Sequence, residues 1–311
     1  MSKTFLSIVT PAYNEEGTIL ECIRKVSEVM SGLEKQVSYE HIIIDNASTD
    51  RTLDLALEAA RSNPQLVIAR NDRNIGGTRN IYRGLTLTKG EWVVPMLPAD
   101  LQDPAETIPE FLKNIGDECN VVFGVRKNRQ ESFLMRTFRT FYYKVIRRFS
   151  STDIPLHSGE FCLISRDAVD SILEVQDENP YVRGLIAQIA QNPKFVNYTW
   201  GKRMAGESKA SPFVLAEVAV TGLVSTSQVP ARIALLSGIG ISIGSIIWAL
   251  IQVGLVVFGN STFGAGIPTI IVAVFFFGGL QLFFTGLIGE YVLSIHRQVK
   301  KSPAVKTRKL H

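Results

Sequence analysis

Charged residues are missing from one long stretch of this sequence: positions 233–289 contain no Asp, Glu, Lys or Arg. This absence excludes an ordinary solvated surface there. The stretch is long enough for two membrane-spanning helices of roughly 20 residues each, joined by a short turn. We predict spans at 233–258 and 267–293, within a membrane segment that we assign to 233–295.

Cysteine is also scarce: the chain has three, an odd number, without the spacing of a metal site. We therefore expect reduced structural thiols in a reducing compartment. The sequence shows no signal peptide either, because the first apolar run, at 5–9, is short. Arg232 precedes the membrane segment and a basic tail at 296–311 follows it. The positive-inside rule then places the N-terminal domain and both termini in the cytoplasm.

Residues 1 to about 230 have an ordinary globular composition, and we assign 1–210 to one globular domain. Short apolar runs alternate with segments of helical periodicity, which is typical of βαβ units. We predict an α/β fold with a mainly parallel sheet. The strands show little polar–apolar alternation, which indicates helices on both faces of the sheet. The predicted strands are 5–10, 41–45, 66–69, 92–97 and 120–124.

Three polar turns follow predicted strands: a first turn at 11–16, a second at 45–50 and a third at 98–103. The carboxyl ends of parallel strands share one edge of a sheet, which is where such folds bind ligands. We therefore expect the three turns to form one site. Tyr13 in the first turn suits a nucleotide base, although an aromatic side chain there can also serve packing alone.

The third turn carries the residues best suited to bind a cation. Asp100 and Gln102 are two positions apart, so their side chains point the same way if the chain is extended. Two oxygen donors on one side suit a hard divalent cation that also takes oxygens from a diphosphate. Asp103 precedes Pro104 and has Glu106 three residues later, which predicts a helix N-cap rather than a metal ligand.

Basic and aromatic residues interleave at 132–150, as in an amphipathic helix that lies in a membrane interface. A packed helix with a solvated basic face explains the same pattern, and both interpretations stay open. An apolar stretch at 211–229 leads into the membrane segment, and we assign 211–232 to a juxtamembrane amphipathic helix. We expect no nucleic-acid partner, because two spans follow and no nucleic-acid-binding module is recognisable.

The three turns and their strands resemble the successive signatures of inverting A-type glycosyltransferases of family 2. The closer resemblance is to polyisoprenyl-phosphate glycosyltransferases, the group that contains dolichyl-phosphate mannose synthase and bacterial undecaprenyl-phosphate glucosyl- and aminoarabinosyltransferases. It extends over essentially the whole chain, because the motifs keep the family's order and two spans follow. The matching segments are Ser7-Ile-Val-Thr-Pro-Ala-Tyr-Asn-Glu-Glu16, Ile44-Asp-Asn-Ala-Ser-Thr-Asp50, Ala99-Asp-Leu-Gln-Asp-Pro104, Gly124-Val-Arg126, Ser158-Gly-Glu-Phe161 and Arg203-Met-Ala-Gly-Glu-Ser-Lys209.

This resemblance implies a membrane-anchored enzyme that moves a sugar from a nucleotide sugar, with UDP favoured, to undecaprenyl or dolichyl phosphate. It implies a bacterial inner-membrane location, permits a homo-oligomer, and implies Mg²⁺ or Mn²⁺ bound by Asp100 and Gln102. The implied nucleotide-binding residues are Pro11, Tyr13, Glu15, Asp45 and Asn46. The implied residues for the acceptor and phosphates are Arg126, Arg136, Arg203, Ser208 and Lys209. The implied catalytic residues are Asp100, Glu160 and Arg126.

The sequence departs from the family pattern in three places. Pro98 stands where the first carboxylate of an Asp-x-Asp motif is usual, Asp45-Asn-Ala-Ser48 replaces Asp-Asp-Gly-Ser, and Glu160 replaces an aspartate. Loss of the carboxylate at position 98 lowers the charge of the metal site and predicts weaker metal affinity. It also leaves a catalytically silent, nucleotide-sugar-binding scaffold as the alternative. A processive polysaccharide synthase is disfavoured, because the sequence has no Gln-x-x-Arg-Trp motif.

Overall fold

The computed structural model divides the chain into two compact units. One unit comprises Met1–Arg147, Thr152–Ser211 and Lys301–His311, and the other comprises Arg148–Ser151 and Pro212–Lys300. The residues that the structure describes are 3–116, 118–127, 158–175, 180–201, 236–251 with gaps, 266–299 and 305–311.

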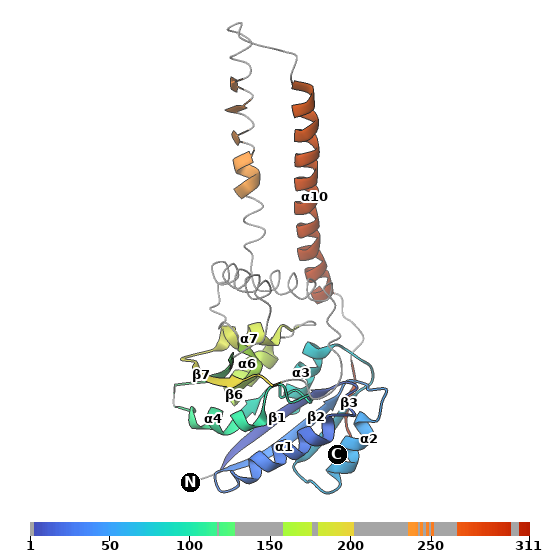
Figure 1. Cartoon of the computed structure of the whole chain (residues 1–311), viewed down its shortest axis with the longest axis vertical. Coiled ribbons are helices and arrows are strands. Elements are labelled where there is room, and N and C mark those ends of the chain that lie inside the picture. Colours follow the sequence, from blue (N-terminus) through green and yellow to red (C-terminus); the bar gives the residue numbers. More distant parts are fainter. Residues whose placement is uncertain are drawn as a thin grey trace. The chain divides into compact units, whose positions relative to one another are not determined.

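The first unit is built on one sheet (Figure 1), in which the described strands follow the order β7-β5-β6-β4-β1-β2-β3-β8. The central strands β4, β1, β2 and β3 run parallel, β7 runs parallel to β5, and β6 and β8 run antiparallel to their neighbours. The predicted α/β fold with a mainly parallel sheet is therefore confirmed. The strands are β1 (Thr4–Ala12), β2 (Val37–Asp45), β3 (Leu66–Asn71), β4 (Trp92–Val94), β5 (Val121–Lys127), β6 (Ser158–Ser165), β7 (Lys194–Thr199) and β8 (Thr307–Lys309).

Helices cover both faces of this sheet. The core on one face joins strand residues such as Leu6 to helices α1 and α4, whereas the core on the other face joins Val9 to helices α3, α6 and α7. Apolar side chains on both sides of β1 explain why its sequence shows little alternation. The helices are α1 (Ile19–Ser31), α2 (Thr52–Ala60), α3 (Gly77–Leu85), the 3₁₀ helix η1 (Ala105–Thr107), α4 (Ile108–Lys113), α6 (Arg166–Glu174) and α7 (Val182–Ile189).

Strand β4 is shorter than the predicted strand at 92–97. It ends at Val94 because the next residue, Pro95, has no N–H group to continue the ladder. The chain then stays close to β1, since the N–H of Leu97 donates to the carbonyl of Val9 at 2.8 Å. The residues from Pro95 onward are thus outside the strand, although they still run beside β1 as far as Leu97.

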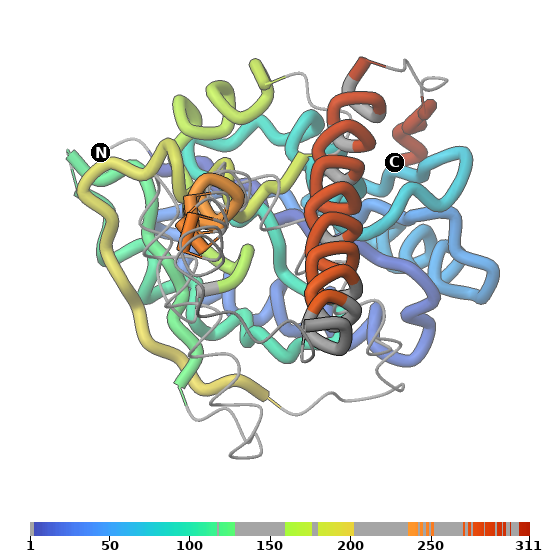
Figure 2. Tube along the Cα trace, turned by 90° about the horizontal axis from the view of Figure 1, so that it is seen from above, coloured from blue at the N-terminus to red at the C-terminus, as the bar shows by residue number. Residues whose placement is uncertain are grey.

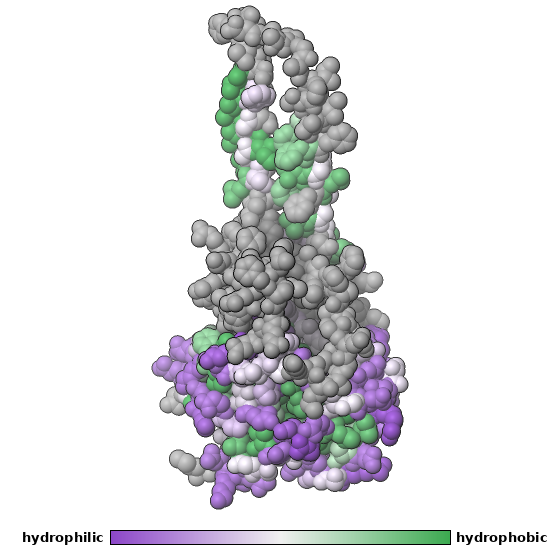
Figure 3. All heavy atoms as spheres, viewed as in Figure 1, coloured by the Kyte–Doolittle hydropathy of each residue, from purple (hydrophilic) through white to green (hydrophobic). Residues whose placement is uncertain are grey.

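The second unit contains α10 (Gly266–Val299), which includes the predicted span at 267–293. Its segment Phe276–Leu293 has a mean hydropathy of 1.4, and within the described residues this is the one helix long and apolar enough to cross a membrane. Figure 3 shows hydrophobic residues along this unit, whereas the sheet-bearing unit presents many hydrophilic ones. The described positions between 236 and 251 are helical. The rest of the predicted first span, and the helices predicted at 132–150 and 211–229, lie outside the described residues.

Candidate active site

One edge of the sheet carries all three polar turns. Strand β1 pairs in parallel with both β2 and β4. The first turn follows β1 and the second follows β2. The third turn comes after β4, four residues beyond its last residue. The three turns are therefore neighbours at the carboxyl edge of the sheet, where open α/β folds bind their ligands.

Hydrogen bonds join the first and second turns. The N–H of Asn46 donates to the carbonyl of Ala12 at 2.9 Å. The N–H of Asn14 donates to the Ser48 hydroxyl at 3.0 Å, and its side-chain oxygen accepts from the N–H of Thr49 at 2.9 Å. Because donors and acceptors come from both turns, the two turns are held as one structural unit.

Each of the three turns contains one non-glycine residue with a left-handed backbone. These residues are Asn14 (φ 55°), Ala47 (φ 59°) and Leu101 (φ 53°). Such a conformation costs an L-residue about 1–2 kcal/mol, and asparagine tolerates it better than alanine or leucine. Elsewhere in the described part of the chain, Asn192 is the other non-glycine residue with a positive φ. Strained backbone is concentrated at binding and catalytic sites, which supports a functional role for this edge.

The left-handed residue in the third turn changes the geometry expected for the cation ligands. The extended chain assumed for Asp100 and Gln102 is wrong, because Leu101 bends the backbone between them. Strand alternation therefore does not align their side chains. Instead, the Asp100 carboxylate accepts a hydrogen bond from the N–H of Gln102 at 3.1 Å. The carbonyl of Gln102 accepts one from the N–H of Gly201 at 2.8 Å, which ties the third turn to the chain beyond β7.

Asp100 is nearly buried, with 6% of the residue exposed. Its carboxylate interacts electrostatically with the Cys22 thiol on α1. Burial raises the pKa of the Cys22 thiol to about 12, and the Asp100 carboxylate adds to this shift. Among the described residues, no group of three or more His, Cys, Asp or Glu side chains is arranged to hold a metal ion. Mg²⁺ sites completed by substrate phosphates use only one or two carboxylates, so Asp100 and Gln102 fit such an ion rather than a protein cage.

The Asp45–Asn46 pair at the end of β2 is buried, with 1% and 3% of the two residues exposed. One Asp45 oxygen lies 3.4 Å from Nε of Arg70, and the carboxylate also accepts from the N–H of Ser48 at 3.2 Å. The side-chain oxygen of Asn46 accepts from Nδ2 of Asn71 at 3.2 Å. Both members of the pair are thus held by adjacent residues of β3.

An amide network behind Asn46 was not predicted. Asn46 donates through Nδ2 to Asn74 at 2.8 Å, Asn71 donates to Asn80 at 2.8 Å, and Asn80 donates to the Ile44 carbonyl at 3.0 Å. The three asparagines at 71, 74 and 80 were a visible signal in the sequence. Their joint role could not be recognised, because it depends on β3 and α3 both lying against the end of β2.

The remaining predicted nucleotide-binding residues lie in or just after β1. Pro11 is the partner of Ile44 in the β1–β2 ladder. Tyr13 is 38% exposed, so its ring is accessible to a ligand. The Glu15 carboxylate accepts from the Thr18 hydroxyl at 2.9 Å, and its N–H donates to the Thr52 hydroxyl at 2.8 Å. Glu15 therefore connects the first turn to the starts of α1 and α2.

Arg126, near the end of β5, forms a bidentate ion pair with Asp103. Its Nε donates to Oδ1 at 3.0 Å and its Nη2 to Oδ2 at 2.8 Å. The Tyr198 hydroxyl donates to the same carboxylate, and the guanidinium carbon lies 5.3 Å from the ring centroid of Trp200. Burial alone would lower the pKa of Arg126, but the charge of Asp103 outweighs it and the pKa is raised.

The predicted N-cap role of Asp103 is wrong. The helix η1 begins after Pro104 without a side-chain cap, and the Asp103 carboxylate is bonded to Arg126 and Tyr198 instead. The guanidinium offers this carboxylate two parallel donors, a stronger arrangement than the single backbone N–H of an N-cap. Burial raises the pKa of Tyr198, and the neighbouring Asp103 charge raises it further.

Glu160 lies on β6, partly buried, beside a close contact between strands β5 and β6. A Cβ on Gly159 would lie 3.2 Å from Nη2 of Arg126, and a Cβ on Gly124 would lie 2.7 Å from the Phe161 carbonyl. Glycine is needed at position 124 because that backbone atom cannot move aside. Glu160 is therefore next in sequence to a residue that lies against Arg126.

Four predicted phosphate-binding residues lie outside the described part of the chain: Arg136, Arg203, Ser208 and Lys209. The described candidates fall into two groups. One is the first and second turns with Tyr13 and the Asp45–Asn46 pair. The other is the third turn with Asp100, Arg126 and the start of β6.

A mainly parallel α/β sheet with polar turns at its carboxyl edge is the arrangement of the A-type glycosyltransferase fold. The chain belongs to the family "Glycosyl transferase family 2", whose model matches residues 7–173. It is 30% identical to the SfII prophage-derived bactoprenol glucosyl transferase of Shigella flexneri, over 98% of each chain. It is 31% identical to the uncharacterized glycosyltransferase sll0501 of a Synechocystis species, over 96% of this chain and 93% of that one.

Among solved structures, glucosyl-3-phosphoglycerate synthase from Mycobacterium tuberculosis in complex with UDP shares the fold. It aligns with a TM-score of 0.50 and 20% identity, over 70% of this chain and 76% of that chain. The family match and the similarity to curated transferases along nearly the whole chain show that this protein is a glycosyltransferase enzyme.

Proposed function

We propose that the protein transfers one sugar from a nucleoside diphosphate sugar to a polyprenyl phosphate and so makes a lipid-linked monosaccharide. The observation that carries this proposal is the 30% identity to a bactoprenol glucosyl transferase over 98% of both chains. Bactoprenol is a polyprenol, which gives the acceptor class, and the glucosyl group of that relative makes UDP-glucose the first donor to test.

In this proposal the nucleotide binds against the first and second turns. The exposed Tyr13 ring stacks on the base or covers it, as accessible aromatic rings do with planar ligands. The Asp45–Asn46 pair forms the polar base of the nucleotide site, and Pro11 and Glu15 line the site beside it. Buried polar groups of fixed orientation favour a ligand with matching hydrogen-bond partners, because a mismatched ligand leaves them unpaired.

Asp100 and Gln102 would hold Mg²⁺ or Mn²⁺ against the donor diphosphate. When bound, such an ion neutralises the negative charge that develops on the leaving diphosphate. The N–H of Gln102 orients the Asp100 carboxylate, and the bond from Gly201 to Gln102 holds the third turn in place. With Pro98 in place of a second carboxylate, the protein contributes less charge to the ion, and the donor contributes more of its ligands.

The transfer breaks the bond between the anomeric carbon and the diphosphate oxygen and forms one between this carbon and an acceptor phosphate oxygen. A phosphate monoester carries about −1.5 to −2 charges at neutral pH, so it attacks without a strong general base. The Asp103 pair uses Nε and Nη2 of Arg126, and we assign Nη1 to the acceptor phosphate. Glu160 orients the acceptor beside it, aided by Arg136, Arg203, Ser208 and Lys209. A single displacement inverts the anomeric configuration.

The membrane segment places the enzyme where its acceptor is. In this proposal the predicted span at 233–258 is the first and α10 is the second, so that both termini and the sheet lie on the cytoplasmic side of a bacterial inner membrane. Anchoring at the surface that displays the lipid phosphate raises its effective concentration at the site.

A donor screen tests the proposal. Purified full-length protein receives polyprenyl phosphate, Mn²⁺ and one of a panel of nucleotide sugars, and mass spectrometry detects the lipid product. Polyprenol without the phosphate is the matched control acceptor. We expect a hexosyl polyprenyl phosphate from UDP-glucose and no product from polyprenol. Product from none of the donors would contradict the proposal, and nucleotide binding by calorimetry without turnover would favour the silent scaffold.

A further inference from the structure

The last strand of the chain, β8, pairs with the residues of β3 that contact the Asp45–Asn46 pair of the proposed nucleotide site. It pairs antiparallel with β3, with Arg308 opposite Arg70 and Thr307 opposite Asn71. In the strand order β8 is the last strand, and Figure 2 shows the red C-terminal end of the chain beside blue segments of the trace. The pairing is extended at both ends: Leu310 donates to the Ile68 carbonyl at 2.7 Å, and Asp72 donates to the Lys306 carbonyl at 3.1 Å.

Two of the three ladder partners of β8, Arg70 and Asn71, are also the residues of β3 that contact the Asp45–Asn46 pair. Arg70 contacts Asp45 at 3.4 Å, and Asn71 donates to Asn46 at 3.2 Å. Thr307 adds a side-chain bond, since its hydroxyl donates to Oδ1 of Asn71 at 2.8 Å. A continuous path of hydrogen bonds therefore runs from Thr307 through Asn71 to Asn46.

The direction of this path matters because the two ends of an amide are not interchangeable. The Thr307 hydroxyl engages the oxygen of Asn71, which leaves the Asn71 nitrogen to face the oxygens of Asn46 and Asn80. The hydroxyl is the β8 partner of the Asn71 oxygen, and its removal leaves this orientation to the bonds with Asn46 and Asn80. The Asn46 amide is also held by the N–H of Ile75 at 3.0 Å and by Asn74 at 2.8 Å. Any turn of Asn71 away from its present orientation therefore costs the Asn71–Asn46 bond and loosens this side of Asn46.

We propose that Thr307 is a positioning residue for the donor site: through Asn71 it helps to hold the Asn46 amide in the orientation in which that amide contacts the nucleotide. The inference rests on the proposed function, in which the Asp45–Asn46 pair is the floor of the nucleotide pocket. It makes the C-terminus of the chain, which follows α10 after a short linker, part of donor recognition rather than a free basic tail.

The competing explanation is that β8 only protects an edge of the sheet. Its exposed Arg308 and Lys309 are typical of such edge strands. The two explanations differ in what the hydroxyl does. Edge protection depends on the backbone ladder, which a change at the Thr307 side chain keeps. The bond that holds the oxygen of Asn71 from the β8 side depends on the hydroxyl.

Thr307→Val tests this difference because it keeps the shape of the side chain and removes the donor. Full-length protein is titrated with UDP by calorimetry, KM is measured for UDP-glucose and for polyprenyl phosphate, and thermal unfolding is recorded. We expect the Kd for UDP and the donor KM to rise about tenfold, as one lost orienting bond implies. The acceptor KM stays unchanged, Thr307→Ser restores the wild-type values, and Lys309→Ala, in the same strand, has no effect.

Equal UDP affinity in Thr307→Val and wild type would overturn the inference and leave the proposed function standing. Weaker binding that Thr307→Ser does not restore, or that follows the melting temperature, would assign β8 to edge protection and also overturn it. A wild-type protein that binds neither UDP nor GDP would refute the nucleotide pocket itself.

Discussion

Arg126 and Asp103 form an ion pair, with Nη2 and Oδ2 2.8 Å apart, that ties the third turn to strand β5. Only 2% of the Asp103 side chain and 20% of the Arg126 side chain are exposed. The same carboxylate receives the Tyr198 hydroxyl from β7. The turn that carries Asp100 follows β4 in the middle of the sheet, and residues of β5 and β7, at one end of the strand order, hold it in position.

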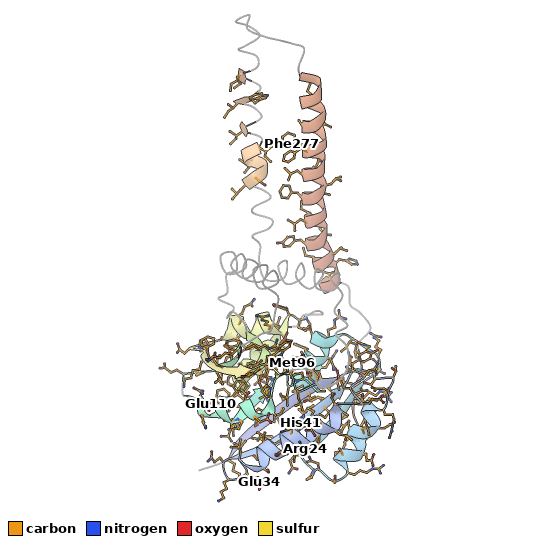
Figure 4. The ribbon with its side chains drawn as sticks, viewed as in Figure 1. Arg24, Glu34, His41, Met96, Glu110 and Phe277 are labelled. Carbon is orange, nitrogen blue, oxygen red and sulfur yellow. The ribbon has the colours of Figure 1, made fainter. Side chains whose placement is uncertain are left out.

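Asp103→Asn should destabilise the protein, because it keeps the shape of the side chain but leaves the guanidinium without a carboxylate. Loss of one partner from a mostly buried pair costs about 2–4 kcal/mol. Thermal unfolding of detergent-solubilised protein measures the effect. Glu110→Gln is the matched control: it breaks an exposed pair with Lys113, and Glu110 lies on the outer helix α4 (Figure 4). That change should cost less than about 1 kcal/mol. Equal melting temperatures for the two variants would refute the prediction.

Ala47→Gly should stabilise the protein. Ala47 has a φ of 59°, which costs an alanine about 1–2 kcal/mol and a glycine almost nothing. The added freedom of glycine in the unfolded chain offsets about 0.4–1 kcal/mol of this gain. We expect a net increase of about 0.5–1 kcal/mol in the free energy of unfolding. The control, Ala59→Gly within α2, should instead lose about 1 kcal/mol. A lower stability for Ala47→Gly would contradict the strain assigned to the second turn.

Pro98→Asp should tighten metal binding, because it returns a second carboxylate to the third turn. The backbone bond at this position is kept, since the carbonyl of Pro98 accepts from the N–H of Leu101. We expect the Mn²⁺ concentration for half-maximal activity to fall about tenfold, the size of one added favourable ionic contact. Activity is measured across a metal titration, with Pro98→Asn as the uncharged control. The same half-maximal concentration in both variants would argue against an ion at this turn.

The buried His41 on β2 should make the protein less stable in mild acid (Figure 4). Burial lowers its pKa to about 3, whereas the unfolded value is 6.5, so the unfolded chain binds more protons between these pH values. The contribution of neutral His41 to the free energy of unfolding is complete above pH 6.5. It is lost as the pH falls below 6.5, by up to about 1.4 kcal/mol per pH unit. The melting temperature of wild type should therefore fall more steeply below pH 6.5 than that of His41→Gln, which can still bond to the Thr10 hydroxyl. Parallel curves would contradict this assignment.

The sequence was sufficient to predict the central strands and the site edge. The apolar runs at 41–45 and 66–69 became β2 and β3, and the polar turns after β1, β2 and β4 lie side by side. These features depend on local periodicity and on the shared direction of parallel strands. Both can be read from the chain without knowing any long-range contact.

The rest depended on contacts between residues far apart in the chain. Asp103 has the sequence context of an N-cap, but its partners Arg126 and Tyr198 lie 23 and 95 positions away. Strand β8 has three residues, two of them basic, and forms only because β3 offers an unpaired edge. The left-handed backbone of Leu101 could not be predicted either, because leucine is not a residue type that favours turns.

The most direct test of the central claim is the rate of lipid glycosylation by Asp100→Asn beside wild type, at saturating Mn²⁺ with polyprenyl phosphate and UDP-glucose. If Asp100 holds the ion on the donor diphosphate, the wild type forms the lipid product and the variant forms it at least about 100-fold more slowly, with an unchanged melting temperature. An Asp100→Asn enzyme that works at the wild-type rate would contradict the account.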